Sequence, residues 1–329
     1  MHARLRTAGL VLAAVFLVAC HKGGPSTGTG RHAHDPLAVL PLPELADPSL
    51  PIFVLADLDA VRASGYLDSF LARVRSEVVT DQQPGDEIFL SLLDRTSDAY
   101  VGFTDAATGN DLDLGVVVAR GQYTADDTTR LEATMDAAVT HVAHGPYQLS
   151  CDADACFTFL GGHTLVVGRQ ALLVATLDRQ LQGGGGALTR DRDLAPLLDA
   201  TQAGSSDVVA GAIAHPAVIR ALSSELPAGL VETMRAGAAT ASFQGGLTLK
   251  ARVRTTSPEA AADGAARVRE PIDAARRNPM MLAFGLRDVL DAVVVEAQGN
   301  DTVASISLPD ARVRQLATML EGLLQMGGG

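Results

Sequence analysis

The sequence contains no tryptophan, and aromatic residues make up only 4% of its 329 residues. Proteins that bind single-stranded nucleic acids or sugars commonly stack them on aromatic rings, and few such rings are present here. Lysine is also scarce, with only Lys22 and Lys250, and 38 carboxylates against 26 lysines and arginines give a net charge of −12. A chain of this sign repels phosphate backbones, so we expect no nucleic-acid partner.

Long apolar runs are absent as well. The run at residues 8–18 follows Arg4 and Arg6, which is the arrangement of a secretory signal. It is too short to remain as a membrane-spanning helix, and no later run reaches the necessary length. We therefore expect residues 1–19 to be a signal peptide and the remainder to be a soluble chain of net charge −14, since two arginines are lost with the signal.

The apolar run ends in Leu17-Val18-Ala19-Cys20, which resembles the lipobox of bacterial lipoproteins. The resemblance implies cleavage before Cys20 and acylation of that residue, so that several acyl chains hold the protein stably on a bilayer. In enterobacterial lipoproteins an Asp after the cysteine marks retention in the inner membrane. His21 stands there instead, which favours the outer membrane, facing the periplasm or the surface. The alternative is an ordinary cleaved signal that happens to contain a cysteine.

Only two other cysteines occur, Cys151 and Cys156, and they flank a four-residue segment between two alternating apolar runs. A hairpin would place them opposite each other, and export to an oxidising compartment predicts a structural disulfide between them. A metal pair or a redox couple is the alternative. The chain has no second cysteine pair and no C-x-x-C spacing to favour either.

The chain divides by composition into a flexible Gly- and Pro-rich tether at residues 20–51 and two α+β modules at residues 52–186 and 187–329. The runs at 99–103 and 112–118 match those at 239–243 and 247–253 in order and register, which predicts duplicated tandem halves. The frequent hairpins predict largely antiparallel sheets, with helices packed on one face. The class resembled overall is that of bacterial lipoproteins whose tethered α+β domain is built from repeated units.

Helical and strand periodicity predict the individual elements. Strands are expected at 52–55, 99–104, 112–118, 147–150, 157–160, 164–168, 207–214, 293–297 and 303–308. Helices are expected from Asp57 or Asp59 to residue 78, then at 87–93, 124–139, 171–181, 216–235 with a break at Pro227, from Ser257-Pro258 onward, at 280–291, and near the C-terminus.

Histidines are few, and none stands in a recognisable catalytic motif. G-x-S-x-G, H-E-x-x-H and a partnered S-x-x-K are all missing. His141 and His144 are three residues apart, which predicts an exposed pair at a helix C-terminus rather than zinc ligands. We interpret His163 and His215 as turn or cap residues. His32 and His34 belong to the tether, where no ordered metal site is expected.

Three other patterns have ordinary structural interpretations. Asp152 and Asp154 start like a calcium loop but lack its later ligands, which favours a hairpin tip. Residues 183–186 are four glycines without a following Lys-Ser or Lys-Thr, which favours a linker over a phosphate loop. Arg252 and Arg254 alternate along one strand face, with further arginines at 267 and 269. Such a set can receive an anionic ligand, although a solvated face is the simpler interpretation.

The sequence thus predicts a membrane-tethered envelope lipoprotein with a non-enzymatic binding or structural role. Its one certain partner would be the bilayer, through acylated Cys20, and an envelope protein or an apolar ligand is the possible second partner. The alternative is a periplasmic carrier or chaperone for lipids or apolar peptides, if a cavity lies between sheets that are rich in Ala, Val and Leu. An envelope hydrolase is the least favoured option, and no cofactor, metal or active-site residue is predicted.

Overall fold

A computed structural model of the protein describes residues 40, 42–45, 50–66, 86–105, 112–135, 138–153, 155–183, 191–223, 226–283 and 285–326. The predicted signal, the acylation site Cys20, His32 and His34, Asp154, the predicted helix over residues 67–78 and the last three glycines of 183–186 lie outside these residues. The chain forms two compact units. The first consists of Met1–Leu50, Leu55–Phe103 and Leu114–Leu188, and the second of Pro51–Val54, Thr104–Asp113 and Thr189–Gly329.

The main boundary between the units lies between Leu188 and Thr189. Residues 51–54 and 104–113 also belong to the second unit, which the boundaries predicted from the sequence did not include. The predicted tether at residues 20–51 is wrong at its C-terminal end. A short helix, α2 (Leu42–Leu45), lies there, with Leu45 fully buried and its carbonyl accepting a hydrogen bond from Arg179 at 3.0 Å. The physical reason is that Leu42, Leu45 and Leu50, which stand among these prolines, have apolar side chains that are buried.

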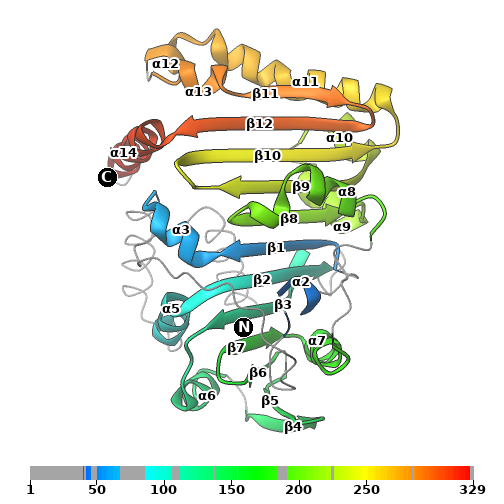
Figure 1. The fold of residues 1–329 in the computed structure, drawn as a ribbon, viewed down its shortest axis with the longest axis vertical. Coiled ribbons are helices and arrows are strands. Elements are labelled where there is room, and N and C mark those ends of the chain that lie inside the picture. The colour runs from blue at the N-terminus through cyan, green and yellow to red at the C-terminus, as the bar shows by residue number, and fades with distance from the viewer. Residues whose placement is uncertain are drawn as a thin grey trace. The chain divides into compact units, whose positions relative to one another are not determined.

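The elements of the first unit alternate between helices and hairpins (Figure 1). They are α2, β1 (Ile52–Asp57), α3 (Leu58–Ser64), α5 (Asp86–Asp94), β2 (Thr96–Asp105), β3 (Leu112–Gly121), α6 (Ala125–Glu132), β4 (Thr140–His144), β5 (Tyr147–Cys151), β6 (Cys156–Leu160), β7 (Thr164–Gly168) and α7 (Gln170–Leu181). The sheet order in this unit is β2-β3-β7-β6-β5-β4, and every pair from β3 to β4 is antiparallel.

The second unit is a five-stranded antiparallel sheet in the order β8-β9-β10-β12-β11 (Figure 1). Its elements are α8 (Ala195–Ala200), η1 (Ala203–Ser205), β8 (Val208–Ile213), α9 (Pro216–Leu222), α10 (Ala228–Thr233), β9 (Met234–Ser242), β10 (Gly246–Thr255), α11 (Pro258–Arg276), α12 (Pro279–Ala283), α13 (Arg287–Asp291), β11 (Val294–Gln298), β12 (Asp301–Pro309) and α14 (Asp310–Met326).

The two units share a sequence of elements. In each, a pair of strands leads into a helix, a later hairpin follows, and the last strand of that hairpin pairs with the second strand of the first pair: β7 with β3, and β12 with β10. The first unit has the additional strands β4 and β5 between its helix α6 and that hairpin. This correspondence of order is what a duplication would produce, and the duplication itself stays a prediction.

Helices cover both faces of the sheet in the second unit, so the prediction that they pack on one face is wrong. Thr240 of β9 lies opposite Lys250, and Thr302 of β12 lies opposite Val253. Lys250 and Val253 are three residues apart on one strand and therefore point to opposite faces. The Thr240 hydroxyl donates to the carbonyl of the residue that ends α8 at 3.0 Å, and the Thr302 hydroxyl donates to a carbonyl of α11 at 2.9 Å. Arg252 and Arg254 lie on the same face as Lys250, and the sequence predicted that this face is exposed to solvent. The Thr240 hydroxyl instead forms a hydrogen bond there with the end of α8.

Local capping rules account for several helix boundaries. Asp57 accepts a hydrogen bond from the Ala60 N–H at 2.8 Å and starts α3, which ends at Gly65 in the left-handed conformation. Ser257 caps α11 with Pro258 in the first position, as predicted. The predicted helix over 280–291 is wrong in one respect, since Gly285 at φ 66° separates it into α12 and α13.

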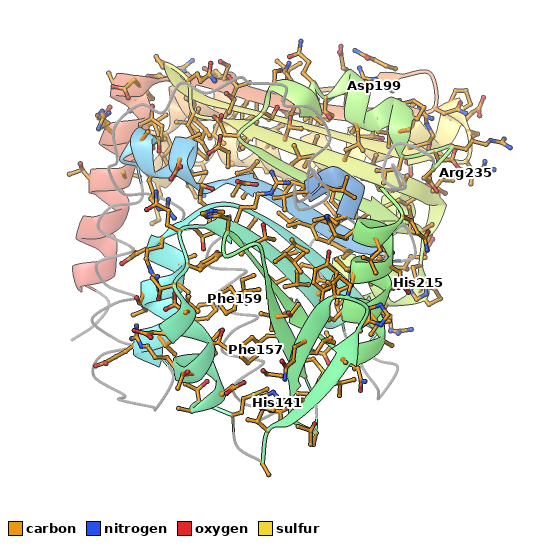
Figure 2. All side chains as sticks on the ribbon, turned by 60° about the horizontal axis from the view of Figure 1, so that its bottom comes forward. His141, Phe157, Phe159, Asp199, His215 and Arg235 are labelled. Carbon is orange, nitrogen blue, oxygen red and sulfur yellow. A yellow bond between two sulfur atoms is a disulfide. The ribbon has the colours of Figure 1, made fainter. Side chains whose placement is uncertain are left out.

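The first unit has an aromatic core between its sheet and the helices α5 and α6. Phe157 and Phe159 lie on β6 (Figure 2), with ring centroids 6.1 Å apart, and Tyr123 lies 5.4 Å from Phe159. Aliphatic side chains complete the cluster: Ile88, Leu92, Val117, Ala119, Leu131, Met135, Leu165 and Val167. These three rings therefore contribute to the core of the first unit rather than to its surface.

Candidate functional site: an arginine-lined pocket

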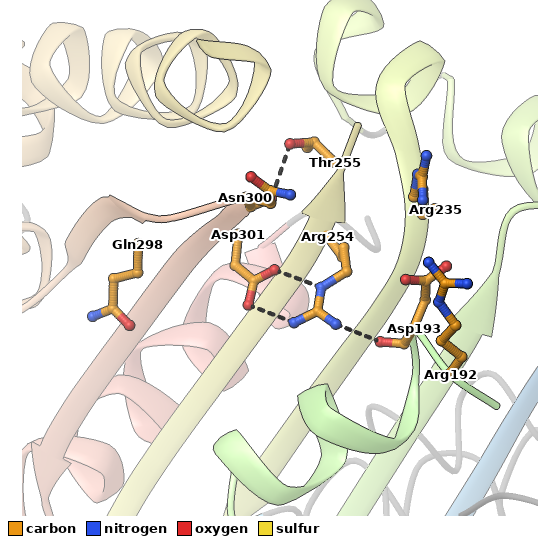
Figure 3. Close-up of a pocket in the computed structure, with 8 residues that line it drawn as sticks. All are labelled: Arg192, Asp193, Arg235, Arg254, Thr255, Gln298, Asn300 and Asp301. Carbon is orange, nitrogen blue, oxygen red and sulfur yellow. Dashed lines mark hydrogen bonds and ion pairs between the residues drawn. The ribbon is translucent and has the colours of Figure 1, made fainter. Parts of the chain in front are cut away.

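A polar pocket of 460 Å³ lies in the second unit, where β9 begins and β10 ends (Figure 3). The turn between β11 and β12 and the segment before α8 complete its wall. Eight residues line it, and every one is charged or polar: Arg192, Asp193, Arg235, Arg254, Thr255, Gln298, Asn300 and Asp301. The volume lies within the range of small-molecule pockets, but the lining lacks the apolar walls that most such pockets have.

A β-bulge brings Arg235 to the pocket. Arg254 of β10 lies opposite Ala236 and Thr255 lies opposite Met234, so Arg235 is the extra residue of β9 and has no partner in the ladder. An extra residue bends its strand and redirects its side chain, and here that side chain contributes to the pocket wall. The sequence had assigned Arg235 to the end of a helix over 216–235. That helix ends at Thr233, and the last two residues belong to β9.

A tight turn before α8 positions Arg192. The Asp191 carboxylate accepts hydrogen bonds from the N–H groups of Asp193 at 2.9 Å and Leu194 at 2.7 Å. Leu194 is buried, which anchors the turn to the core of the unit. The Arg254 guanidinium also donates to the Asp193 carbonyl at 3.4 Å and so links the turn to the sheet. Arg192 is thus held beside the strand ends by contacts of its neighbours.

The floor of the pocket is a buried ion-pair cluster. Asp301 has a side chain that is 7% exposed, and it pairs with Arg254 at 2.9 Å and with Arg252 at 3.4 Å. Both Asp301 oxygens accept from Arg254, so the pair is bidentate. This hydrogen bond to Asp301 is the main cause that raises the pKa of Arg254 above its ordinary value. The carboxylate and its two cations hold one another in place, and one positive charge remains in excess.

Two guanidinium groups at the pocket differ from Arg254. Arg192 and Arg235 are exposed, and among the described residues neither side chain makes a hydrogen bond or an ion pair. In Figure 3 both side chains lie on the same side of Arg254, away from Asp301 and Gln298. They are the two cations of this site that remain available to a ligand.

The neutral groups of the site are mostly engaged within the protein. The Thr255 hydroxyl contacts the carbonyls of Ser257 and Asn300, each at 2.9 Å, and Thr255 is buried. Gln298 accepts from Arg252. Histidine, cysteine, serine and lysine are absent from the lining, and its one hydroxyl, that of Thr255, is the group already bound to the carbonyls of Ser257 and Asn300.

The sequence had proposed Arg252 and Arg254 as a solvated face, and the structure corrects that interpretation. Their side chains are 20% and 23% exposed and converge on Asp301. Arg267 and Arg269 take no part, because Arg267 pairs with Asp263 at 2.7 Å and Arg269 donates to the Val295 carbonyl at 2.7 Å.

Arg192, Arg235 and Asp301 were missed by the sequence reasoning. One signal was available for Asp301, since it directly follows Gly299-Asn300, a pair typical of a turn, between the strands expected at 293–297 and 303–308. Its contact with Arg254 requires that β12 pair with β10, although α11, α12, α13 and β11 lie between these two strands in the chain. No local pattern encodes that pairing.

The histidine pair does not lie at a helix end, and that prediction is wrong. α6 ends at Glu132, and His141 and His144 belong to strand β4, where a spacing of three places them on opposite faces (Figure 2 labels His141). His144 contacts Asp178 of α7 at 2.8 Å, and His141 lies 3.8 Å from Glu132. β4 pairs with β5 over five positions, and this pairing overrides the short helical pattern.

The disulfide between Cys151 and Cys156 is present in the structure. The two residues form the last antiparallel pair of the β5–β6 hairpin, with their Cα atoms 4.0 Å apart. Asp152 lies at the hairpin tip and accepts from the Ala155 N–H at 2.8 Å, a turn contact that agrees with its predicted place. Both cysteines are buried.

The remaining histidines occupy the predicted kinds of position. His163 is in the turn between β6 and β7, where its N–H donates to the Leu160 carbonyl at 3.2 Å. His215 is the N-cap of α9, and its Nδ1 accepts from the Ala217 N–H at 3.4 Å (Figure 2).

No group of three or more His, Cys, Asp or Glu side chains within the described residues is arranged to hold a metal ion. None of their helices combines the length and the apolar composition that crossing a membrane requires.

Comparison with known proteins identifies no family. No family model matches the chain, and no curated protein matches it. Crystal form III of TP0453 aligns with 87% of this chain and 99% of its own chain, at 12% identity and a TM-score of 0.47. Crystal form I of TP0453 aligns with 87% and 98%, at 13% identity and the same TM-score. The chain is thus similar to these structures at a distance from which no functional residue is transferred.

Proposed function

We propose that this protein is a membrane-tethered lipoprotein of the cell envelope with a non-enzymatic binding role, and that the arginine-lined pocket is its ligand-binding site. The observation that carries the proposal is the wholly polar lining, with two exposed arginines that have no partner within the described residues. Groups held ready in this way are typical of binding sites, where a few placed polar groups fix the ligand.

The tether rests on the sequence. Arg4 and Arg6, the short apolar run and the segment ending at Cys20 together resemble a lipoprotein signal. Acylated Cys20 would hold the two units at a bilayer, and His21 favours the outer membrane by the same resemblance. The wholly polar lining, with the exposed guanidinium groups of Arg192 and Arg235, supports a role in binding.

A carrier or chaperone for lipids or apolar peptides is the alternative function, and this pocket does not favour it. Burying an apolar chain against eight polar side chains would desolvate them without new hydrogen bonds, which is unfavourable. A bound lipid in the purified protein, identified by mass spectrometry, would favour the alternative over the present proposal.

The tether is tested by growing cells with a radioactive or clickable fatty acid and comparing the natural protein with Cys20→Ala. We expect label on the natural protein and none on Cys20→Ala. The variant His21→Ala keeps the cysteine and serves as the matched control that should retain label. Label on Cys20→Ala, or none on the natural protein, would contradict the tether.

The pocket is tested separately with Asn300→Trp. Asn300 lies exposed in the turn between β11 and β12 with an ordinary backbone conformation, so a large side chain there should fill the pocket without disturbing the fold. Thermal stabilisation by a panel of anionic, neutral and cationic polar compounds would be compared between the natural protein and this variant. Stabilisation by any compound that Asn300→Trp abolishes supports the binding site, and none for the whole panel refutes it.

A further inference from the structure

The geometry points to a ligand that carries an oxyanion, a phosphate or a carboxylate group on a small polar molecule, which Arg192 and Arg235 bind together. This inference rests on the proposed binding role and adds the chemical class of the ligand. It comes from the distribution of charge and hydrogen-bonding groups around the pocket.

The pocket is a positive site on an acidic protein. Its lining has three arginines and two aspartates, and Arg252 lies directly behind Asp301, so cations are in excess by two. The whole chain carries −12. Glu296 lies outside the lining and accepts a hydrogen bond from Gln298. This local excess of positive charge repels a cationic ligand and attracts an anionic one.

The buried ion pairs of Asp301 explain why Arg192 and Arg235 form no ion pair with this carboxylate. Asp301 is 7% exposed and is already neutralised by Arg252 and Arg254, so it does not attract Arg192 or Arg235. Asp193 is the one remaining carboxylate in the lining, and it forms no ion pair with an arginine in the described part of the chain. The positive charges of Arg192 and Arg235 exceed the negative charge of Asp193 by one, so one more anionic group would balance the site.

The positions of both arginines are built in by the backbone. The bulge at Arg235 and the Asp191-capped turn at Arg192 hold their Cα positions on two different segments. Guanidinium groups donate in a planar fork that matches the oxygens of carboxylate and phosphate. The side-chain amide of Asn300 lies on another part of the wall and suits a hydroxyl or carbonyl group on the same ligand. A pocket of 460 Å³ admits a molecule larger than a bare ion.

The experiment is a titration of the acylated full-length mature protein, in nonionic detergent at low ionic strength, with inorganic phosphate and separately with succinate. Arginine side-chain N–H signals followed by NMR report on the site. We expect saturable shifts at Arg192 and Arg235 with at least one of the two probes. Arg192→Gln and Arg235→Gln should each weaken binding by roughly ten-fold, since each removes a charge-assisted hydrogen-bond donor.

Arg277→Gln is the matched control, because Arg277 is an exposed arginine of the same unit outside the pocket lining. It should leave the affinity unchanged. Shifts with phosphate alone identify a phosphate-bearing ligand, and shifts with succinate alone identify a carboxylate. No saturable shift with either probe, or equal weakening by Arg277→Gln, overturns the inference. Neutral compounds that bind in the panel described above and lose binding in Asn300→Trp would then leave the proposed function standing without this ligand class.

Discussion

The ion pair between Asp127 and Arg95 in the first unit predicts a specific dependence of stability on pH. Asp127 is 1% exposed and receives two hydrogen bonds of 2.8 Å from the Arg95 guanidinium. The N–H of Thr124 donates to the same carboxylate at 2.7 Å, as at the start of a capped helix. These contacts, the Arg95 hydrogen bond first among them, lower the pKa of Asp127 from 3.8 to about 2.

The magnitude follows from the shift in pKa. A carboxyl whose pKa is lower in the folded state stabilises the fold above its unfolded pKa, and this stabilisation disappears as pH falls through the folded pKa. The full contribution is about 2 kcal/mol at pH 7, and about 1 kcal/mol of it is lost by pH 3. Asp127→Asn keeps the shape but not the charge, and we therefore expect it to unfold about 2 kcal/mol more easily at pH 7.

The assay is urea unfolding of the natural protein and Asp127→Asn at pH 7 and pH 3, followed by fluorescence of the tyrosines. The difference in free energy between the two proteins should shrink by about 1 kcal/mol at the lower pH. Asp126→Asn, in the same turn but exposed, is the control and should show neither effect. A difference that stays the same at both pH values would refute the assignment of the lowered pKa to Asp127.

Two further predictions concern stability. Replacing both Cys151 and Cys156 by Ser should lower the free energy of unfolding by about 2 kcal/mol, because the disulfide closes a loop of only six residues, and a loss near zero in chemical unfolding would contradict this. Gly121→Ala should destabilise the first unit severely, since the added Cβ would lie 2.2 Å from the Arg95 carbonyl, whereas Gly204→Ala, with open space around it, should leave the melting temperature nearly unchanged. Equal melting temperatures for these two glycine variants would show that the close approach is absent.

Local patterns in the sequence were reliable where the contacts are local. The hairpin with Cys151 and Cys156 needs only two alternating runs and a four-residue loop, and its partners are a few residues apart. The cap at Ser257 followed by Pro258 likewise involves neighbours in the chain. In such cases the energy that selects the structure lies within the segment itself.

Patterns that depend on distant partners misled the sequence reasoning. The prediction for His141 and His144 failed for another reason, since the helical pattern was continued past the end of α6 although these residues form a local hairpin with β5. Leu45, among prolines, read as part of a tether until the structure placed it in the core of the first unit. Tertiary pairing overrides a weak local preference, because a strand gains a whole ladder of hydrogen bonds while a frayed helix end gains few.

What the sequence determined alone is the order of most strands and helices, the hairpin disulfide, the acidic charge and the expectation of a lipid anchor. What only the tertiary structure decided is the pocket: Arg192, Arg235 and Arg254 come from three separate segments, and Asp301 from a fourth. The physical reason is that most side chains of this site come from neighbouring strands of a sheet that are distant in the chain. Their arrangement depends on the pairing of β9, β10 and β12, which hydrogen bonds between distant strands establish and local propensities do not.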